Sequence, residues 1–194
     1  MIETNLSFRS LSNRNKTTTL VLHHAQHKTW NVYDIHAFHK NEKGWSGIGY
    51  HFLVTKDGEI YGGRPERCVG AHCLGHNGYT IGICAQGNFM VEKMPYSQKL
   101  AIINLCSYLC SKYSINTIKG HKELIATDCP GTYYPLNEIK TSVLNKISTT
   151  TYTIKPGDTL FAISKKFNTT VSSLKLKNNL KSNIIYPNEI LKIQ

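Results

Sequence analysis

The sequence predicts an α/β protein with a central mixed β-sheet flanked by helices, followed by a small βααβ domain. Short apolar, β-branched runs alternate with stretches of helical periodicity through residues 17–146. A mainly polar, β-branched joint at 147–151 (ISTTT) has no core of its own, and a second strand–helix–helix–strand pattern follows it. We therefore expect a first domain over residues 1–146, a linker over 147–151 and a second domain over 152–194.

The first half of domain one contains a strand, a helix and a hairpin. Residues 17–24 (TTTLVLHH) form an apolar run typical of a buried strand. A helix is predicted over 31–41, where Asn31 can cap the chain and apolar residues recur every three or four positions. Strands over 50–55 and 59–61 flank Asp57-Gly58, which is a strong hairpin signal.

The second half adds two strands and two helices. A strand is predicted over 79–85, an amphipathic helix over 97–113 and a short strand over 117–119, which leads into Gly120-His121. A closing helix over 136–146 follows the Pro130-Gly131 breaker. In domain two, strands over 152–155 and 189–193 enclose helices over 159–167 and 170–178.

The charge and hydropathy limit the possible partners and location. The net charge of +11 favours a polyanionic partner, which could be nucleic acid, an anionic membrane or an anionic wall polymer. The charge is diffuse and no nucleic-acid-binding motif is present, so no nucleic-acid partner is expected. No apolar run approaches the roughly 20 residues of a membrane span. Residues 1–16 lack the apolar segment of a signal peptide, which predicts synthesis in the cytoplasm and release before any action outside the cell.

Two histidines and a cysteine suggest a catalytic metal site. His23 and His24 end a predicted strand, and only one of them can point to a given face. His121 follows another strand, and Cys129 lies in a loop stiffened by Pro130. Two imidazoles and one thiolate give three protein ligands to Zn²⁺ and leave a fourth position open for water. Of the other cysteines most are expected in the core, and Cys68 and Cys73 could pair under oxidising conditions.

Residues 18–146 resemble the phage-lysozyme type of N-acetylmuramoyl-L-alanine amidase, a family that includes the peptidoglycan recognition proteins. The motifs that carry the resemblance are Val21-Leu22-His23-His24, Trp45 with Gly49-Tyr50-His51-Phe52, Lys56-Asp57-Gly58, Val69-Gly70-Ala71-His72, Asn77 with Thr80-Ile81-Gly82-Ile83, Gly87-Asn88-Phe89, Gly120-His121 and Thr127-Asp128-Cys129-Pro130-Gly131.

The resemblance implies a mechanism and a set of site residues. One Zn²⁺ would be bound by His23, His121 and Cys129. It would polarise the amide carbonyl between N-acetylmuramic acid and L-alanine and lower the pKa of its water. Tyr50 would be the catalytic tyrosine, while His72 and Asn77 would contact the muramyl peptide.

Two positions depart from the phage-lysozyme pattern. Thr127 stands where that pattern has a lysine, and the active recognition-protein amidases resemble this chain in having a threonine there. We expect Thr127 to be a weaker oxyanion or leaving-group partner than a lysine. Cys84 stands where some relatives carry a glutamate that could act as general base. Tyr50, Glu123 and the metal-activated water therefore remain alternatives for the base.

Residues 152–194 resemble a LysM domain, which binds glycans containing N-acetylglucosamine. The motifs are Tyr152-Thr153-Ile154-Lys155-Pro156-Gly157-Asp158-Thr159-Leu160, Asn178-Asn179-Leu180 and Ile184-Ile185-Tyr186-Pro187-Asn188. The resemblance implies a glycan-binding groove formed by Gly157, Asp158, Thr159, Leu160, Ile184, Ile185 and Tyr186. A domain that only packs against the amidase is the alternative.

Together these features predict a zinc amidase that cuts peptidoglycan, of the endolysin type made by a phage or prophage. A host autolysin or sporulation amidase is a near variant. The alternative from another class is a non-catalytic peptidoglycan-binding protein on the same fold. Receptor-type relatives commonly lose the cysteine ligand, so Cys129 favours the enzyme.

Overall fold

The structure is a computed structural model that describes residues 1–147 and 151–193. The chain divides into two compact units, residues 1–144 and 145–194. Within the predicted linker, residues 148–150 lie outside the described residues, so the linker at 147–151 stays a prediction. No helix in the described part of the chain is long and apolar enough to cross a membrane.

A five-stranded sheet forms the centre of the first unit. Its strands are β1 (Thr19–His24), β2 (Phe52–Val54), β3 (Ile60–Gly62), β4 (Thr80–Ala85) and β5 (Ile118–Gly120). They lie in the order β3-β2-β4-β1-β5. β1 pairs in parallel with β4 and β5, and β2 pairs in parallel with β4 but antiparallel with β3. The predicted mixed sheet is confirmed.

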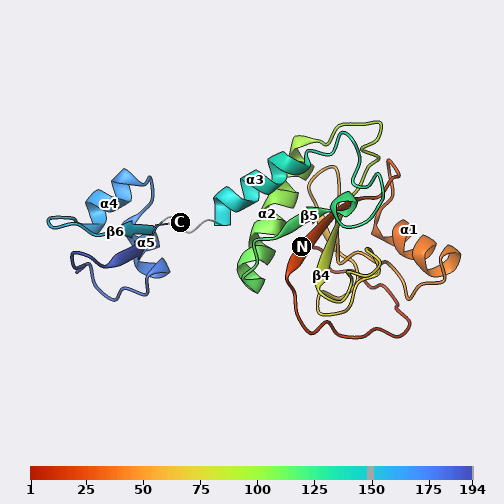
Figure 1. The fold of residues 1–194 in the computed structure, drawn as a ribbon, viewed down its shortest axis with the longest axis horizontal. Coiled ribbons are helices and arrows are strands. Elements are labelled where there is room, and N and C mark those ends of the chain that lie inside the picture. Colours follow the sequence, from red (N-terminus) through yellow and green to blue (C-terminus); the bar gives the residue numbers. More distant parts are fainter. Residues whose placement is uncertain (148–150, 194) are drawn as a thin grey trace. The chain divides into compact units, whose positions relative to one another are not determined.

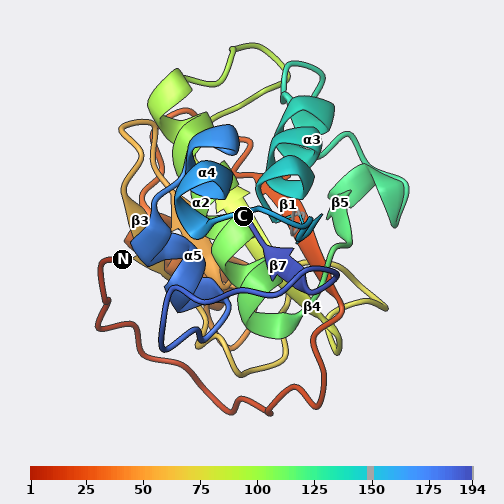
Figure 2. The same ribbon diagram turned by 90° about the vertical axis from the view of Figure 1, so that its left-hand side faces the viewer.

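Helices cover both faces of this sheet. Figure 1 shows α1 (Val32–Ala37) on one side, with α2 (Tyr96–Tyr113) and α3 (Leu136–Ile147) on the other. Figure 2 shows α2 and α3 next to each other over the strands. Ile102, Leu109 and Ile139 of these two helices are fully buried. The α1 face is filled by a cluster that includes Val32, Ile35, Leu53 and Cys84.

The strand register determines which way each histidine of β1 points. His23 pairs with Cys84, and Cys84 pairs with Leu53. Because side chains of paired residues project to the same face, His23 points to the α1 face, and the next residue points to the opposite one. There His24 Nδ1 accepts a hydrogen bond from the Phe89 N–H at 3.1 Å.

The helix predicted over residues 31–41 differs most from the structure. Asn31 caps it as expected, but the α-helix ends at Ala37 and a π-helical turn follows over Phe38–Glu42. His39 lies in this turn, where its carbonyl accepts from the Trp45 N–H and its Nδ1 accepts from the Gly49 N–H at 3.1 Å. These bonds to a distant segment favour the wider turn, which local periodicity cannot reveal. Other element ends differ from expectation by one or two residues.

The second unit has the predicted βααβ order. Its elements are β6 (Thr151–Thr153), α4 (Leu160–Lys166), α5 (Val171–Lys177) and β7 (Ile190–Lys192), and the two strands pair antiparallel. Thr159 and Thr170 cap the helices by accepting from the N–H groups of Ala162 and Ser173. The core consists of Ile154, Leu160, Ile163, Leu174, Leu191 and Ile193.

Candidate metal centre and active site

The candidate metal ligands meet at the carboxyl-terminal edge of the parallel strands. His23 is the penultimate residue of β1, and His121 directly follows β5. Cys129 lies in the loop beyond a short 3₁₀ turn over His121–Glu123. Because β1 and β5 are adjacent and parallel, their ends bring the two imidazoles together. This edge is where open α/β sheets place ligands.

The three side chains form a compact donor cluster. The candidate donor atoms of His23, His121 and Cys129 all lie within 4.8 Å of one another. The Nδ1 atom of His23 is 3.7 Å from the Cys129 sulfur, and the ring centroids of His23 and His121 are 4.4 Å apart. His23 is buried, whereas the other two are half-buried. The cluster is therefore reachable from one side.

The donor set fits a zinc ion. The buried Nε2 atom of His121 has no hydrogen-bond partner among the described residues. A buried nitrogen without a partner is costly unless something else binds it. Two imidazole nitrogens and one sulfur are typical zinc donors, and three protein ligands leave a position for water or substrate.

Burial keeps the imidazoles in the form that binds a metal. The pKa of His23 lies well below its usual range, because burial and then its neighbouring histidines disfavour the charged ring. Burial also lowers the pKa of His121. The same effect raises the pKa of the Cys129 thiol to about 12, so the thiolate requires a nearby cation.

Several main-chain contacts fix the Cys129 loop. The Lys122 N–H donates to the Cys129 carbonyl at 2.8 Å, and the Cys129 N–H donates to Thr127 Oγ1 at 3.3 Å. The His24 N–H donates to the Cys129 sulfur at 3.5 Å. Gly131 packs so closely on the Phe89 main chain that a Cβ there would lie 2.6 Å from its carbonyl carbon. The main chain of His24 therefore contacts the loop directly, and its ring supports the loop indirectly by accepting from the Phe89 N–H.

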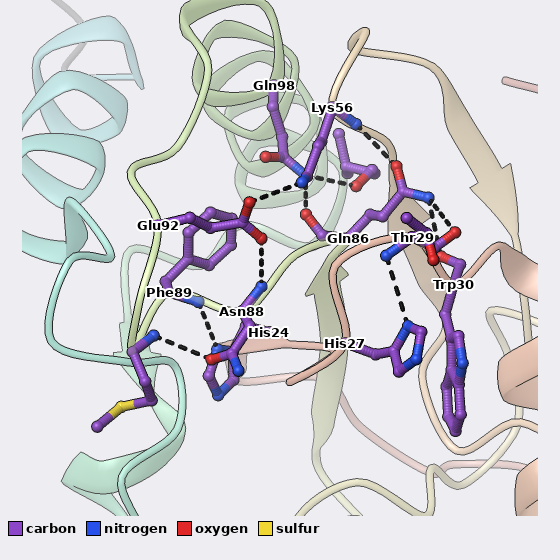
Figure 3. A network of polar contacts seen from close by, with 12 residues as sticks. His24, His27, Thr29, Trp30, Lys56, Gln86, Asn88, Phe89, Glu92 and Gln98 are labelled. Carbon is purple, nitrogen blue, oxygen red and sulfur yellow. Dashed lines mark hydrogen bonds and ion pairs between the residues drawn. The ribbon is translucent and has the colours of Figure 1, made fainter.

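A polar network anchors the neighbouring loop between β1 and α1 (Figure 3). The Gln86 side chain donates to the carbonyls of Thr29 and Trp30, each at 3.0 Å, and accepts from the Lys56 N–H at 3.1 Å. Gln98, which is fully buried, donates to the Gln86 carbonyl at 2.8 Å. Through these bonds, α2 and the hairpin hold the loop that forms one wall of the site.

Two hollows flank the donor cluster, and His121 lines both. The first, of about 340 Å³, is lined by residues that include His39, Lys43, Tyr50, Thr127 and Cys129, and we call it the tyrosine pocket. The second, of about 370 Å³, is lined by Trp45, Ala71, His72, Cys73, Leu74, Asn77, His121 and Ile125, and we call it the tryptophan pocket. An extended substrate could occupy both while its middle lies over the donor cluster.

Tyr50 and Thr127 lie beside the donors. Tyr50 lies two residues before the start of β2, and its ring centroid is 5.1 Å from that of His23. Burial raises the pKa of its hydroxyl well above the usual range, so the group is a proton donor and a poor base. Thr127 lines the same pocket while accepting from the Cys129 N–H.

His72 and Asn77 have clear structural contacts besides lining the tryptophan pocket. His72 is only 7% exposed, and its Nδ1 atom is 3.0 Å from His23 Nε2. The side-chain Oδ1 atom of Asn77 accepts from the N–H groups of His72 and Cys73 at 2.8 and 2.9 Å. Asn77 thus shapes the loop that carries His72.

The alternatives for the general base are unequal. Glu123 accepts from the Gly120 N–H and forms an ion pair with Lys140 at 2.7 Å. Burial alone would raise its pKa, but Lys140 and the Gly120 N–H outweigh burial and lower it. Glu123 also lines neither pocket. Cys84 is fully buried, and burial raises its pKa well above the usual range, so it cannot replace a glutamate as base. Cys68 and Cys73 are free thiols.

The predicted glycan residues of the second unit fall into two groups. Ile184 and Tyr186 are well exposed, at 64% and 62%. Leu160 is 2% exposed and belongs to the core, so a glycan contact there would have to use its main chain. Asp158 accepts from the Lys155 N–H and the Tyr152 hydroxyl, both at 2.8 Å, and thereby closes the turn around Gly157.

Two pocket residues were not among the site residues predicted from the sequence. His39 lines the tyrosine pocket, and burial lowers its pKa to about 4. Because its Nδ1 accepts from Gly49, its Nε2 carries the proton as a donor. Trp45 lines the tryptophan pocket and is 40% exposed. The signal in the sequence was only its position five residues before the catalytic candidate Tyr50, because its exposure is visible only in the structure.

Comparison with known families identifies two regions. Residues 13–132 match the family model described as N-acetylmuramoyl-L-alanine amidase, and residues 152–194 match the LysM domain. The first region contains the three donor residues and the residues that line the two flanking pockets. The second corresponds to the βααβ unit.

Two individual relatives and one solved structure are similar to this chain over part of its length. Peptidoglycan-recognition protein SC2 of Drosophila melanogaster is 37% identical over 111 residues, covering 56% of this chain and 60% of the relative. The endolysin of Escherichia phage T7 is 33% identical over 121 residues, covering 57% and 79%. The solved structure of the amidase LysC from Clostridium intestinale is 40% identical with a TM-score of 0.71, covering 73% of this chain and 95% of that one. The chain thus spans less than two thirds of the SC2 protein.

Proposed function

Because the chain belongs to the N-acetylmuramoyl-L-alanine amidase family, we propose that it hydrolyses the amide bond between N-acetylmuramic acid and L-alanine in peptidoglycan. The proposal includes one Zn²⁺ bound by His23, His121 and Cys129. The observation that carries it is the donor cluster, whose atoms lie within 4.8 Å of one another between two pockets. We further propose that the protein is an endolysin, made by a phage or prophage to lyse its host.

The bound metal would supply Lewis-acid polarisation of the scissile carbonyl and a water of lowered pKa. The Tyr50 hydroxyl, which stays protonated, donates to the oxyanion that develops on that carbonyl. The Nε2–H of His39 is a second donor in the same pocket. Thr127 holds the Cys129 main chain and offers a weaker contact to the substrate.

The two pockets would position the substrate on either side of the scissile bond. The tryptophan pocket is mainly apolar, with Trp45, Leu74 and Ile125 in its walls. The tyrosine pocket contains Lys43 and polar groups. Holding the substrate on both sides of the amide keeps the carbonyl at the donor cluster, and such positioning lowers the barrier without further chemistry.

The LysM domain would keep the enzyme on the wall. We propose that it binds glycan containing N-acetylglucosamine through the exposed Ile184 and Tyr186, together with Ile185 and the turn at residues 157–160. Tethering the catalytic domain to an insoluble polymer raises its effective concentration there. The net charge of +11 would add attraction to anionic wall polymers.

A non-catalytic peptidoglycan-binding protein is the second candidate. It is favoured by the similarity to a peptidoglycan-recognition protein. The presence of Cys129 beside both histidines favours the enzyme, because binding alone requires no open metal position.

The test measures new amino termini and new reducing ends released from purified bacterial walls. The wild type, Cys129→Ser and a chelator-treated sample are compared. We expect new L-alanine amino termini without new reducing ends, and we expect their release to be lost both on chelation and in the variant, because each removes the metal. Walls that are bound but never cut by the zinc-loaded wild type would support the recognition protein instead.

A further inference from the structure

A short hydrogen-bond chain runs from the donor cluster into the core. His23 Nε2 lies 3.0 Å from His72 Nδ1, and both rings are nearly fully buried. The opposite nitrogen of His72, Nε2, lies 3.3 Å from the Thr80 hydroxyl. The Thr80 hydroxyl lies 2.8 Å from the His76 carbonyl. Neither Thr80 nor His76 belongs to the proposed ligands.

The His76 carbonyl, at the end of this series of hydrogen bonds, determines the position of each proton in it. A carbonyl oxygen can only accept a hydrogen bond, so the Thr80 hydroxyl donates its single proton to the His76 carbonyl. The Thr80 oxygen must then accept from His72 Nε2–H.

The tautomer of His72 determines the tautomer of His23. A neutral His72 with its proton on Nε2 has an acceptor at Nδ1, so it receives the proton of His23 Nε2–H. The lone pair of His23 is then at Nδ1, the atom that lies 3.7 Å from the Cys129 sulfur. This is the tautomer that can bind a metal at the donor cluster.

Glycines hold the His72 ring in the required position. A Cβ on Gly82 would lie 2.5 Å from the ring's Cγ and Cδ2 atoms, and a Cβ on Gly70 would lie 2.5 Å from Cδ2. The ring therefore sits in a slot between two main-chain segments that only glycine leaves open. Asn77 fixes the main chain at His72 from the loop side. An imidazole confined in this way cannot rotate to exchange its nitrogens.

We propose that His72, directed by Thr80, is a positioning residue that locks His23 in its metal-binding tautomer. The inference rests on the proposed zinc site and assigns to His72 a role separate from contact with the muramyl peptide. A fixed second partner both orients a ligand imidazole and makes its free nitrogen a better donor. Thr80 sets the tautomer of His72, and Gly70 and Gly82 leave the space that its ring occupies.

The test is the zinc affinity of the full chain, measured by competition with a chelator. His72→Asn keeps an acceptor near the Nδ1 position, whereas His72→Leu has nearly the same shape without one. We expect His72→Leu to weaken zinc binding by about 10–100-fold, with His72→Asn much nearer the wild type. Equal affinities in the two folded variants would overturn the proposal. If only the KM for substrate changed, His72 would be a substrate contact.

A second measurement avoids mutation. The ¹⁵N resonances of the His72 ring in the intact wild type report which nitrogen carries the proton. We expect a protonated Nε2 and a bare Nδ1, and a proton on Nδ1 would overturn the proposal even if His72→Leu fails to fold. Failure of the wild type to bind zinc at all would instead reject the metal site, which separates the two claims.

Discussion

Two kinds of residue belong to the proposed metal centre, and they differ in what they would contribute. His23, His121 and Cys129 would supply donor atoms, and burial favours their neutral forms. Tyr50 is not a candidate metal ligand, but it lines the same pocket as Cys129 and His121. Loss of a ligand should remove metal binding, whereas loss of the hydroxyl should leave it intact and slow the chemistry.

Tyr50→Phe tests this division. We expect turnover to fall about 10²–10³-fold, which is typical for removal of one oxyanion donor, with zinc affinity unchanged. The measurement combines amino-terminus release from walls with zinc competition. Tyr61→Phe is the matched control, because the Tyr61 hydroxyl bonds to Glu59 on the exposed hairpin. Equal turnover in both variants would show that Tyr50 has no catalytic role.

At the scale of elements, the site depends on loops that are held by close main-chain contact. The Cys129 loop is pressed against Phe89 at Gly131, whose φ of +108° favours glycine. Phe89 in turn donates to His24 at the end of β1. A strand end, the β4–α2 loop and the Cys129 loop are therefore joined by direct contacts.

Gly131→Ala should disturb this arrangement. An added Cβ would lie 2.6 Å from the Phe89 main chain, on top of the cost of a positive φ. We expect a loss of about 2–4 kcal/mol in the free energy of unfolding, together with weaker zinc binding because Cys129 shifts. Denaturant unfolding and zinc competition measure the two effects.

Gly75→Ala separates strain from crowding. Gly75 has a φ of +80°, but nothing lies within 4 Å of the position that an added Cβ would take. We expect a loss of about 1–2 kcal/mol with zinc affinity unchanged. Equal effects of the two alanines on both measurements would contradict the role assigned to the Gly131 contact.

The sequence predicts the regular elements better than the contacts between them. Apolar periodicity locates all five strands of the sheet and its two long helices to within a few residues, because burial of one face determines that pattern. The π-helical turn at His39 depends on a bond to Gly49, which no local pattern encodes. The His72–Thr80 contact likewise requires the register of β4 and the slot between Gly70 and Gly82.

At the scale of the whole molecule, the two units have separate cores and separate chemistry. The LysM core consists of its own aliphatic residues. Residues 152–194 contain seven lysines and two acidic residues, so this short region carries five of the eleven net positive charges. Concentrating charge in the binding domain would attract the protein to an anionic wall while leaving the catalytic pockets free to fit their substrate.

Paired substitutions in the LysM domain can show where it meets the wall. Ile184 and Leu176 are both exposed, at 64% and 81%, but only Ile184 belongs to the proposed glycan face. We expect Ile184→Ser to weaken sedimentation with purified walls by about tenfold, equivalent to about 1.4 kcal/mol, and Leu176→Ser to have little effect. Hydrolysis of a soluble muropeptide should be the same in both, because the catalytic pockets are unchanged. The reverse result would move the glycan site to the hollow lined by Leu176, Lys175 and Asn179, and loss of soluble activity in Ile184→Ser would show that the two units do not act independently.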